Sequence, residues 1–434
     1  MSDPGKADVD DAPRRPATFR DVFRIREFRA LFGTFVLSTV GDELARVAVT
    51  VLVYHRTNSP LLSAITFAIG YLPWLLGGPL LAALADRLPR HRVLIGTDVA
   101  RAVLVATMAI PGMPLALMLV LLLLVSLGGP PFESARSALQ ADILDADRYT
   151  VASSVTNVFL QITQVVGFLV AGVLVAAVHP SAALLFDAAT FAVSAVWLAG
   201  RLQRRPPPAA DAGGRASLWR DAVAGLRYIA RTPRLRAIIA LLWAGTMFGN
   251  APEGLVAPFV KQLGQNSAAV GVLLAANPLG VTVAALAIAR LVRPERRERL
   301  IAPLVVLSLA PLALAGLIAQ VAGPGRLTFG VVVALLFVSG LGAAWAIPLN
   351  VSFMQAVPSS HRGRAFGVAV SGLYGAQGVG VLAAGALAEG LPPGGVVAAS
   401  GVLGLLAVVL PLLSFCRTGP TVAGPRPAAG ASVS

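Results

Sequence analysis

Hydrophobic residues fill long, evenly spaced stretches of this chain, and polar residues interrupt them at short intervals. Each stretch has about the 20 residues that an α-helix needs to cross the hydrocarbon core of a bilayer. Glycine, proline or charged residues mark most junctions. The pattern predicts twelve membrane-spanning helices, at residues 30–54, 60–85, 92–113, 115–138, 151–178, 182–200, 236–260, 268–292, 300–321, 328–352, 365–389 and 395–416. We therefore expect an all-α, multi-pass membrane protein.

A break after the sixth segment divides the chain into two similar halves. Short matches recur at an offset of 207 to 208 residues, such as Gly41-Asp42 with Gly249-Asn250. Two pseudo-symmetric six-helix bundles with a site between them are typical of secondary transporters. The expected domains are an N-terminal tail (1–27), a first bundle (28–200), a linker (201–235), a second bundle (236–416) and a C-terminal tail (417–434).

Composition and charge agree with this assignment and orient the chain. The sequence is 56% hydrophobic with a mean hydropathy of +0.77, which excludes an ordinary soluble globular protein. The net charge is +14, yet only Arg56, Lys261 and Arg326 of the 35 basic residues lie in the odd-numbered connections. Because basic loops stay on the cytoplasmic side, we expect both termini in the cytoplasm and a bacterial-type cytoplasmic membrane. Basic residues that follow topology form no single patch, so nucleic-acid binding is not expected.

The linker between the halves is rich in arginine and proline in its first part. Its second part places apolar residues on one helical face, namely Leu218, Trp219, Val223, Leu226 and Ile229. This spacing predicts an amphipathic helix. Such a helix either lies against the inner leaflet or packs on the bundle as an ordinary linker helix, and the sequence leaves both open.

Three charged residues lie deep in the first predicted span. Asp42, Glu43 and Arg46 follow Arg29 by 13 to 17 residues, which places them about 20 to 25 Å along the helix, near the bilayer centre. A charged side chain facing lipid there costs about 2.5 to 3.5 kcal/mol, so these groups must face a cavity or one another. The i,i+4 spacing predicts an ion pair between Asp42 and Arg46. Proton loading and ion pairing would then compete, which predicts that these three residues couple protons to transport.

Other polar and aromatic residues of the spans are candidates for contact with a substrate. Amides at helical spacing are as common in bonds between helices as in ligand contacts, so that alternative stays open. Pro252 and Pro258 are expected to interrupt the seventh span near its polar face. The predicted cavity residues are Phe35, Thr39, Asn157, Gln161, Gln164, Trp243, Thr246, Asn250, Glu253 and Tyr374.

The remaining membrane acids are expected to have structural partners. Asp98 with Arg101, and Glu133 with Arg136, have the i,i+3 spacing of local pairs near the cytoplasmic side. Asp187 falls near the outer end of its segment, at a different expected depth from Asp42.

Several enzyme classes lack their required residues here. Lys6 and Lys261 are the only lysines, and neither stands in a Gly-Lys-Ser/Thr phosphate loop. Cys416 is the only cysteine, so no intramolecular disulfide can form. The four histidines form no HExxH or Cys-His pattern, so we expect no metal, no other cofactor and no enzymatic activity.

The connection after the second segment, residues 82–92, carries a recognisable motif. It resembles the signature Gly-x-x-x-Asp-Arg/Lys-x-Gly-Arg-Arg of the major facilitator superfamily, with Asp86, Arg87 and Arg90 matching and Ala82 and Pro89 at the glycine positions. In that family the motif is a cytoplasmic latch that holds the halves together in the outward-open state. The resemblance implies that role for Asp86, Arg87, Arg90 and Arg92.

Three further stretches resemble the branch that contains enterobactin exporters and macrolide efflux proteins: residues 185–191, 225–229 and 362–367. This similarity covers nearly the whole chain and implies twelve helices and export coupled to proton entry. The antiporter glycine motif of the fifth segment is represented by Gly167, Ala171 and Gly172, without its proline.

Together these features predict a proton-coupled exporter of hydrophobic or amphipathic small molecules, acting as a monomer. Its expected partners are the substrate, protons and the lipid bilayer. One alternative is an importer or facilitator on the same fold. The other is a non-transporting membrane sensor or hydrolase, whose activity would ignore ion gradients.

Overall fold

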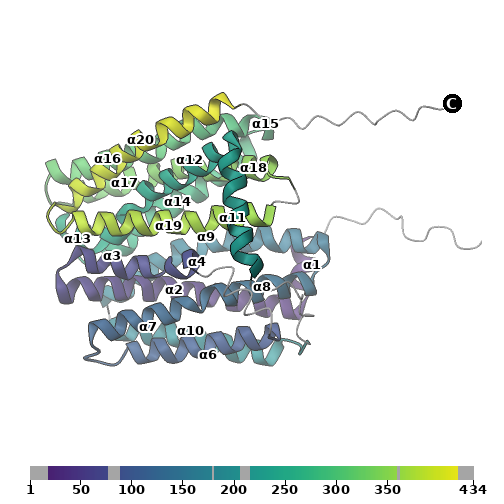
Figure 1. Cartoon of the computed structure of the whole chain (residues 1–434). Coiled ribbons are helices and arrows are strands. Elements are labelled where there is room, and N and C mark those ends of the chain that lie inside the picture. The colour runs from purple at the N-terminus through teal and green to yellow at the C-terminus, as the bar shows by residue number, and fades with distance from the viewer. Residues whose placement is uncertain (1–17, 77–87, 178–179, 206–215, 359–361, 419–434) are drawn as a thin grey trace, which may run out of the picture.

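The protein is described by a computed structural model that covers residues 18–76, 88–177, 180–205, 216–358 and 362–418. All regular secondary structure in these ranges is helical. Most of the long helices lie side by side in two groups, and α11 crosses them at a steep angle (Figure 1). Eight helical stretches within these ranges are long and apolar enough to cross a membrane.

The first group contains the helices before the linker. They are α1 (Phe19–Phe23), α2 (Arg26–Thr57), α3 (Pro60–Ile69), α4 (Leu72–Leu76), α6 (Arg90–Met108), α7 (Leu115–Leu127), α8 (Gly129–Ile143), α9 (Ala146–Ala177) and α10 (Pro180–Arg201).

The second group follows the linker helix α11 (Ala216–Arg231). It contains α12 (Pro233–Asn250), the 3-10 helix η1 (Ala251–Leu255), α13 (Val256–Gln262), α14 (Ala268–Leu291), α15 (Pro294–Arg297), η2 (Glu298–Leu300), α16 (Ile301–Val321), α17 (Arg326–Ala343), α18 (Ala346–Ala356), α19 (Arg362–Leu387) and α20 (Pro393–Arg417).

Local sequence explains where several helices end or break. Asn58 ends α2 in the left-handed conformation, and the Ser59 hydroxyl accepts a hydrogen bond from the Leu62 amide to begin α3. Pro252 stands in the first turn of η1, where the helix beginning at α12 tightens to 3-10 geometry, as the proline positions predict. The expected interruption of the seventh span is therefore confirmed.

The two ends of the molecule differ in charge. One end, here called the arginine-rich end, holds the start of α2 and the end of α20, with residues such as Arg26, Arg293 and Arg417. The other, here called the opposite end, holds the α2–α3 connection and α13, which lie on the left in Figure 1.

The two groups pack closely along α9 with α14 and along α3 with α19. Gly172 on α9 and Gly271 on α14 let the two backbones approach near the opposite end. A Cβ atom added at Gly172 would lie 2.6 Å from the Ala268 carbonyl oxygen and 2.8 Å from the Gly271 Cα. Around this contact a buried cluster joins both groups and includes Phe67, Phe168 and Phe259. The halves therefore form a continuous core at the opposite end.

Polar contacts between the halves gather at the same end. Lys261 Nζ donates to Asn58 Oδ1 at 3.0 Å. Glu389, in the α19–α20 connection, accepts from the Ser59 hydroxyl and from the Leu61 amide at 3.0 Å. These bonds hold the opposite end closed in this conformation.

The Glu389 contact makes closure at the opposite end sensitive to pH. The hydrogen bonds from Ser59, and then from the Leu61 amide, lower the pKa of Glu389 below its ordinary value of 4.5. Because the closed state favours the ionised form, the stabilisation is complete above pH 4.5 and is lost as the pH falls through the lowered pKa. Ile110 and Leu391 are exposed residues in connections at the opposite end. We expect spin labels at these two positions to move apart as the pH falls below 4.5. Glu389→Gln should remove the pH dependence; an unchanged transition would contradict the assignment.

The linker helix α11 packs on α19 and α12. Ile229, on the predicted apolar face, is buried against the second group, whereas Val223 and Leu226 remain exposed. The apolar face of α11 is thus partly packed against the second group. Its exposed part fits contact with lipid, so neither of the two expected placements is excluded. The side chains of Leu218 and Trp219 lie outside the described part of the helix.

Candidate functional site

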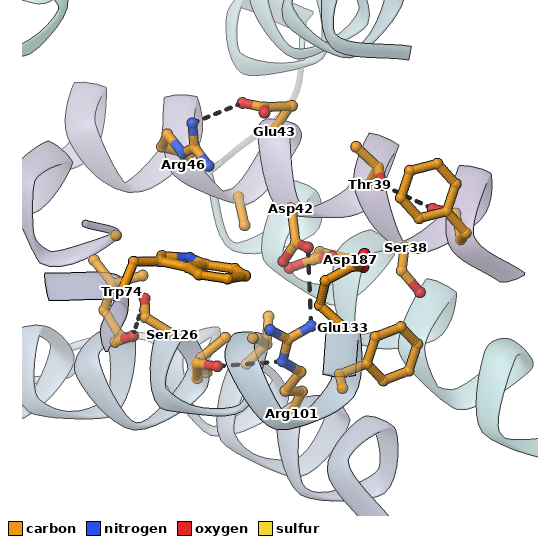
Figure 2. A pocket seen from close by; sticks show the side chains of 18 of the residues that line it. Ser38, Thr39, Asp42, Glu43, Arg46, Trp74, Arg101, Ser126, Glu133 and Asp187 are labelled. Atoms are coloured by element: carbon orange, nitrogen blue, oxygen red, sulfur yellow. Dashed lines mark hydrogen bonds and ion pairs between the residues drawn. The ribbon is translucent and has the colours of Figure 1, made fainter. Parts of the chain in front are cut away.

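A cavity of about 450 Å³ lies mainly within the first group of helices. Helices α2, α6, α8 and α10 supply its charged side chains, such as Asp42, Arg101, Glu133 and Asp187 (Figure 2). Helix α19 contributes Tyr374. Its polar and charged lining includes Ser38, Thr39, Asp42, Glu43, Arg46, Arg101, Ser126, Glu133, Arg136, Asn157 and Asp187. Its aromatic lining is Phe35, Phe67, Trp74, Phe132 and Tyr374. The space therefore combines charged groups with broad apolar rings.

The three charged residues of α2 line this cavity but pair differently from the prediction. Arg46 Nη1 lies 3.2 Å from Glu43 Oε2, and Asp42 Oδ2 lies 3.9 Å from Arg101 Nη1 on α6. The predicted Asp42–Arg46 pair is therefore wrong. Both i,i+3 and i,i+4 neighbours are within reach on a helix, and α6 supplies a second cation on the side of Asp42. The Asp42 side chain is 37% exposed, whereas that of Glu43 is 7% exposed.

Arg101 is fixed from several sides. Its Nε donates to the Val125 carbonyl oxygen at 3.2 Å, and its guanidinium lies 5.2 Å from the centre of the Phe191 ring. These contacts orient the guanidinium so that its Nη1 atom points towards Asp42 (Figure 2). Arg101 is thus the cation nearest to Asp42.

Asp98 does not form the surface pair with Arg101 that its spacing predicts. It is completely buried, and its Oδ2 accepts from the Ser194 hydroxyl of α10 at 2.5 Å. The spacing gave no information on α10, which packs along α6 and supplies the better donor. That prediction is wrong.

Asp187 lies at the level of Asp42 rather than at a different depth. It packs against Gly41, whose missing Cβ leaves room for Asp187 Oδ1, and that oxygen accepts from Thr190 Oγ1 at 3.3 Å. Figure 2 shows the carboxyl groups of Asp42 and Asp187 on the same side of the cavity. The predicted difference in depth between Asp42 and Asp187 is wrong, because the position of a residue along its own segment does not give the relative height of two helices.

The predicted pair of Glu133 and Arg136 on α8 is confirmed. Arg136 Nε donates to Glu133 Oε2 at 2.9 Å, and the guanidinium lies 4.5 Å from the centre of the Phe35 ring. This pair lines the same cavity as the charged residues of α2.

A second cavity, of about 200 Å³, lies between α9 and the second group. Amides and hydroxyls dominate its polar lining, which includes Gln161, Gln164, Thr246, Asn250, Asn277 and Ser308, with Glu253 as its acid. Glu253 stands on η1 and accepts from the Tyr71 hydroxyl at 2.7 Å. This bond links the two halves across the wall between the cavities.

Removing the Tyr71–Glu253 bond is expected to loosen the closed arrangement. A hydrogen bond to a charged group contributes about 1.5 to 3 kcal/mol, so Tyr71→Phe should shift the balance between closed and open states about tenfold or more towards opening. Distances between spin labels at Ile110 and Leu391 measure this shift. Tyr374→Phe is the matched control, because its ring stacks on Trp74 and no hydrogen bond of its hydroxyl is found within the described residues. Equal effects of both variants would contradict a role for this bond.

The predicted substrate contacts divide between the two cavities. Phe35, Thr39, Asn157 and Tyr374 line the first. Gln161, Gln164, Thr246, Asn250 and Glu253 line the second. Trp243 lines neither; its Nε1 donates to the Ala369 carbonyl oxygen at 3.2 Å, and its ring packs against Gly372. We therefore assign Trp243 to packing between α12 and α19.

Only part of the predicted gating motif can be placed. Asp86 and Arg87 lie outside the described residues, and the Arg92 side chain is exposed. Arg90 contacts Asp142 and donates to the Ala138 carbonyl oxygen at 3.3 Å, both on α8. In this conformation Arg90 thus connects α6 to α8 within the first half.

Comparison with known families agrees with this architecture. The sequence-family model of the Major Facilitator Superfamily matches residues 31–325 and 255–434. The chain belongs to the major facilitator superfamily. The match confirms the resemblance to this family at the level of the superfamily.

Solved structures of other transporters share the fold. A mutant of the peptide transporter POT in complex with alafosfalin superimposes with a TM-score of 0.72 at 18% identity, covering 93% of this chain and 96% of that one. A POT family transporter in complex with 5-aminolevulinic acid gives 0.71 at 13% identity, covering 93% and 98%. A mutant of the nucleoside transporter NupG gives 0.70 at 14% identity, covering 89% and 100%. A search of curated proteins found no match.

Proposed function

We propose that this major facilitator superfamily member exports hydrophobic or amphipathic small molecules in exchange for protons, by alternating access. In this proposal the chain spans a bacterial-type cytoplasmic membrane twelve times, with both termini in the cytoplasm. The bundles are residues 28–200 and 236–416, joined by the linker 201–235. It acts as a monomer without a cofactor, and within the superfamily it is assigned to the enterobactin exporter and macrolide efflux branch.

The position of Asp42 carries the proposal. An ionisable group in the middle of a membrane helix is costly and is by default a functional candidate. Asp42 lines the 450 Å³ cavity with 37% of its side chain exposed, so it can exchange a proton with water there. Arg101 lies 3.9 Å away and favours the ionised form. Proton binding at Asp42 therefore competes with the contact to Arg101.

The lining of the cavity supports the proposed substrate class. Phe35, Trp74 and Tyr374 offer flat apolar surfaces, and charged groups of both signs lie within the same space. Because flat apolar rings and charged groups border the same space, the cavity suits molecules that have an apolar body and a polar end.

Closure at the opposite end supports alternating access. The Gly172–Gly271 approach and the Glu389 contacts seal the halves there, and these contacts must separate for the cavity to face the other side. The chain thus has a defined set of interactions that a transport cycle would break and remake.

Flux under an imposed pH gradient tests the proposal. In inside-out vesicles with an acidic lumen, a fluorescent lipophilic cation such as ethidium should accumulate inside as protons leave. Vesicles without the protein, and vesicles with the gradient collapsed by an ionophore, are the controls. Movement of the probe in the reverse direction would instead establish an importer, and flux unaffected by the gradient would establish a facilitator. A growth-inhibition panel in cells with and without the protein then identifies which compounds it exports.

A further inference from the structure

We propose that Asp187 and Asp42 form a proton-sharing carboxyl pair, in which Asp187 stores a proton inside the first half and Asp42 exchanges it with the cavity. Asp187 is thus a second ionisable residue, and it lies behind Asp42, the residue already proposed to couple protons to transport. Its part in transport rests on the proposed function, but its existence does not.

Asp187 is buried without enough partners for an ionised carboxylate. Its exposed fraction is 1%. Oδ1 accepts a single long hydrogen bond from Thr190, and Oδ2 has no hydrogen-bond partner among the described residues. Removing an isolated carboxylate from water without pairing costs far more than removing the neutral acid. Its surroundings therefore favour a bound proton.

Acidic groups outnumber basic groups around Asp187, and this also favours a bound proton. Asp42 of α2 and Arg101 of α6 act on Asp187, and the same two residues also act on Asp98. Helix α9 also touches α10, and its residues 152–177 carry no charge. In the lining of the same cavity, Glu133 and Arg136 pair with each other. Arg101 thus acts on all three carboxyl groups, and Arg46 adds a second positive charge near Asp42 only. Three acids so placed cannot all ionise cheaply.

Arg101 cannot serve all three carboxyl groups at once. Its Nε is bonded to Val125, and its Nη1 lies nearest to Asp42. Asp98 has the Ser194 hydroxyl on one oxygen and no partner on the other among the described residues. Asp187 is consequently the acid of this group with neither a cation nor a short hydrogen bond in the described part of the chain.

Access to Asp187 runs through its neighbour. Asp187 packs on Gly41, the residue before Asp42, and both carboxyl groups border the same cavity. Asp42 is 37% exposed and Asp187 is 1% exposed. In the transfer, the O–H bond of Asp187 breaks as an O–H bond forms on the Asp42 carboxylate. Arg101 then pairs with the newly ionised Asp187, and Asp42 passes the proton to cavity water.

Infrared spectroscopy of the full-length protein in liposomes tests the pair without any substrate. At neutral pH the wild type should show the carbonyl band of a protonated buried acid, with a shift in D₂O. Asp187→Asn should remove most of this band, whereas Asp98→Asn, at a buried acid that accepts a short hydrogen bond from Ser194, should change it less. Loss of the band in Asp98→Asn with retention in Asp187→Asn would overturn the proposal, as would absence of the band in the wild type. Asp187→Glu, which should move the band rather than remove it, covers the case in which Asp187→Asn fails to fold.

Two further measurements distinguish a shared proton from a bound metal cation and from an acid without a part in transport. If the band disappears when Na⁺ replaces choline, a metal cation rather than a proton occupies the site, and the proposal is wrong. In vesicles, Asp187→Asn should lose gradient-driven accumulation of the probe while probe exchange without a gradient persists; unchanged accumulation would overturn the transport role. A wild-type band in a protein that moves no probe would refute the proposed function alone.

Discussion

Asp42→Asn is expected to reduce gradient-driven transport to the level of vesicles without the protein. Asparagine keeps the size of aspartate but binds no proton in this pH range, so the competition between proton and Arg101 disappears. Asp42 is also the cavity-facing member of the pair with Asp187. The measurement is ethidium accumulation in inside-out vesicles with an acidic lumen, normalised to the amount of inserted protein.

A surface substitution controls for the chemistry of this change. Asp145→Asn makes the same replacement at a side chain that is 60% exposed and pairs only with Arg148 among the described residues. Exposed pairs of this kind contribute little to stability, so transport should be unchanged. Undiminished transport by Asp42→Asn would remove Asp42 from the mechanism, and equal losses in both variants would point to a general defect.

Gly172→Leu is expected to hold the opposite end open and to stop transport. The new side chain would begin 2.6 Å from the Ala268 carbonyl oxygen and 2.8 Å from the Gly271 Cα. These are backbone atoms of packed helices, which cannot give way as a flexible side chain can. The closed contact between α9 and α14 therefore cannot form, and the chain is confined to one side of its cycle.

Spin labels at Ile110 and Leu391 in a Cys416→Ser background report this state. The distance distribution should move to longer values in Gly172→Leu, and ethidium accumulation should fall to background. Gly330→Leu makes the same change on α17, where an added Cβ meets no atom within 4 Å, and it should behave like the wild type. A wild-type distance distribution in Gly172→Leu would show that this close approach does not control closure.

Hydropathy predicted the eight described helical stretches that are long and apolar enough to cross a membrane, because burial in a bilayer demands long apolar runs. The proline positions predicted the break near Pro252, since proline cannot continue the hydrogen bonds of a helix. Neither pattern predicted which helices meet. The partner of Asp42 comes from α6, and the donor to Asp98 comes from α10, through contacts that depend on tertiary packing.

Asp187 shows the same limit for the candidate site. Its distance along its own segment indicated an outer position, but the offset between α2 and α10 brings it against Gly41. A small residue directly before an intramembrane acid was the available signal, since glycine permits close approach of another helix. Spacing within one helix cannot supply the relative height of two helices.

The two cavities differ in their chemistry. The first cavity, mainly within the first half, carries most of the ionisable lining, whereas the second cavity, between α9 and the second half, is walled mainly by amides and hydroxyls. The contrast extends to equivalent positions of the repeat, where Asp42 in one copy corresponds to Asn250 in the other. Under the proposed function, the ionisable groups that exchange protons would thus be concentrated in one copy of the repeat. Substitutions among the amides and hydroxyls of the second cavity would then alter the shape and polarity of the transport path without touching those groups.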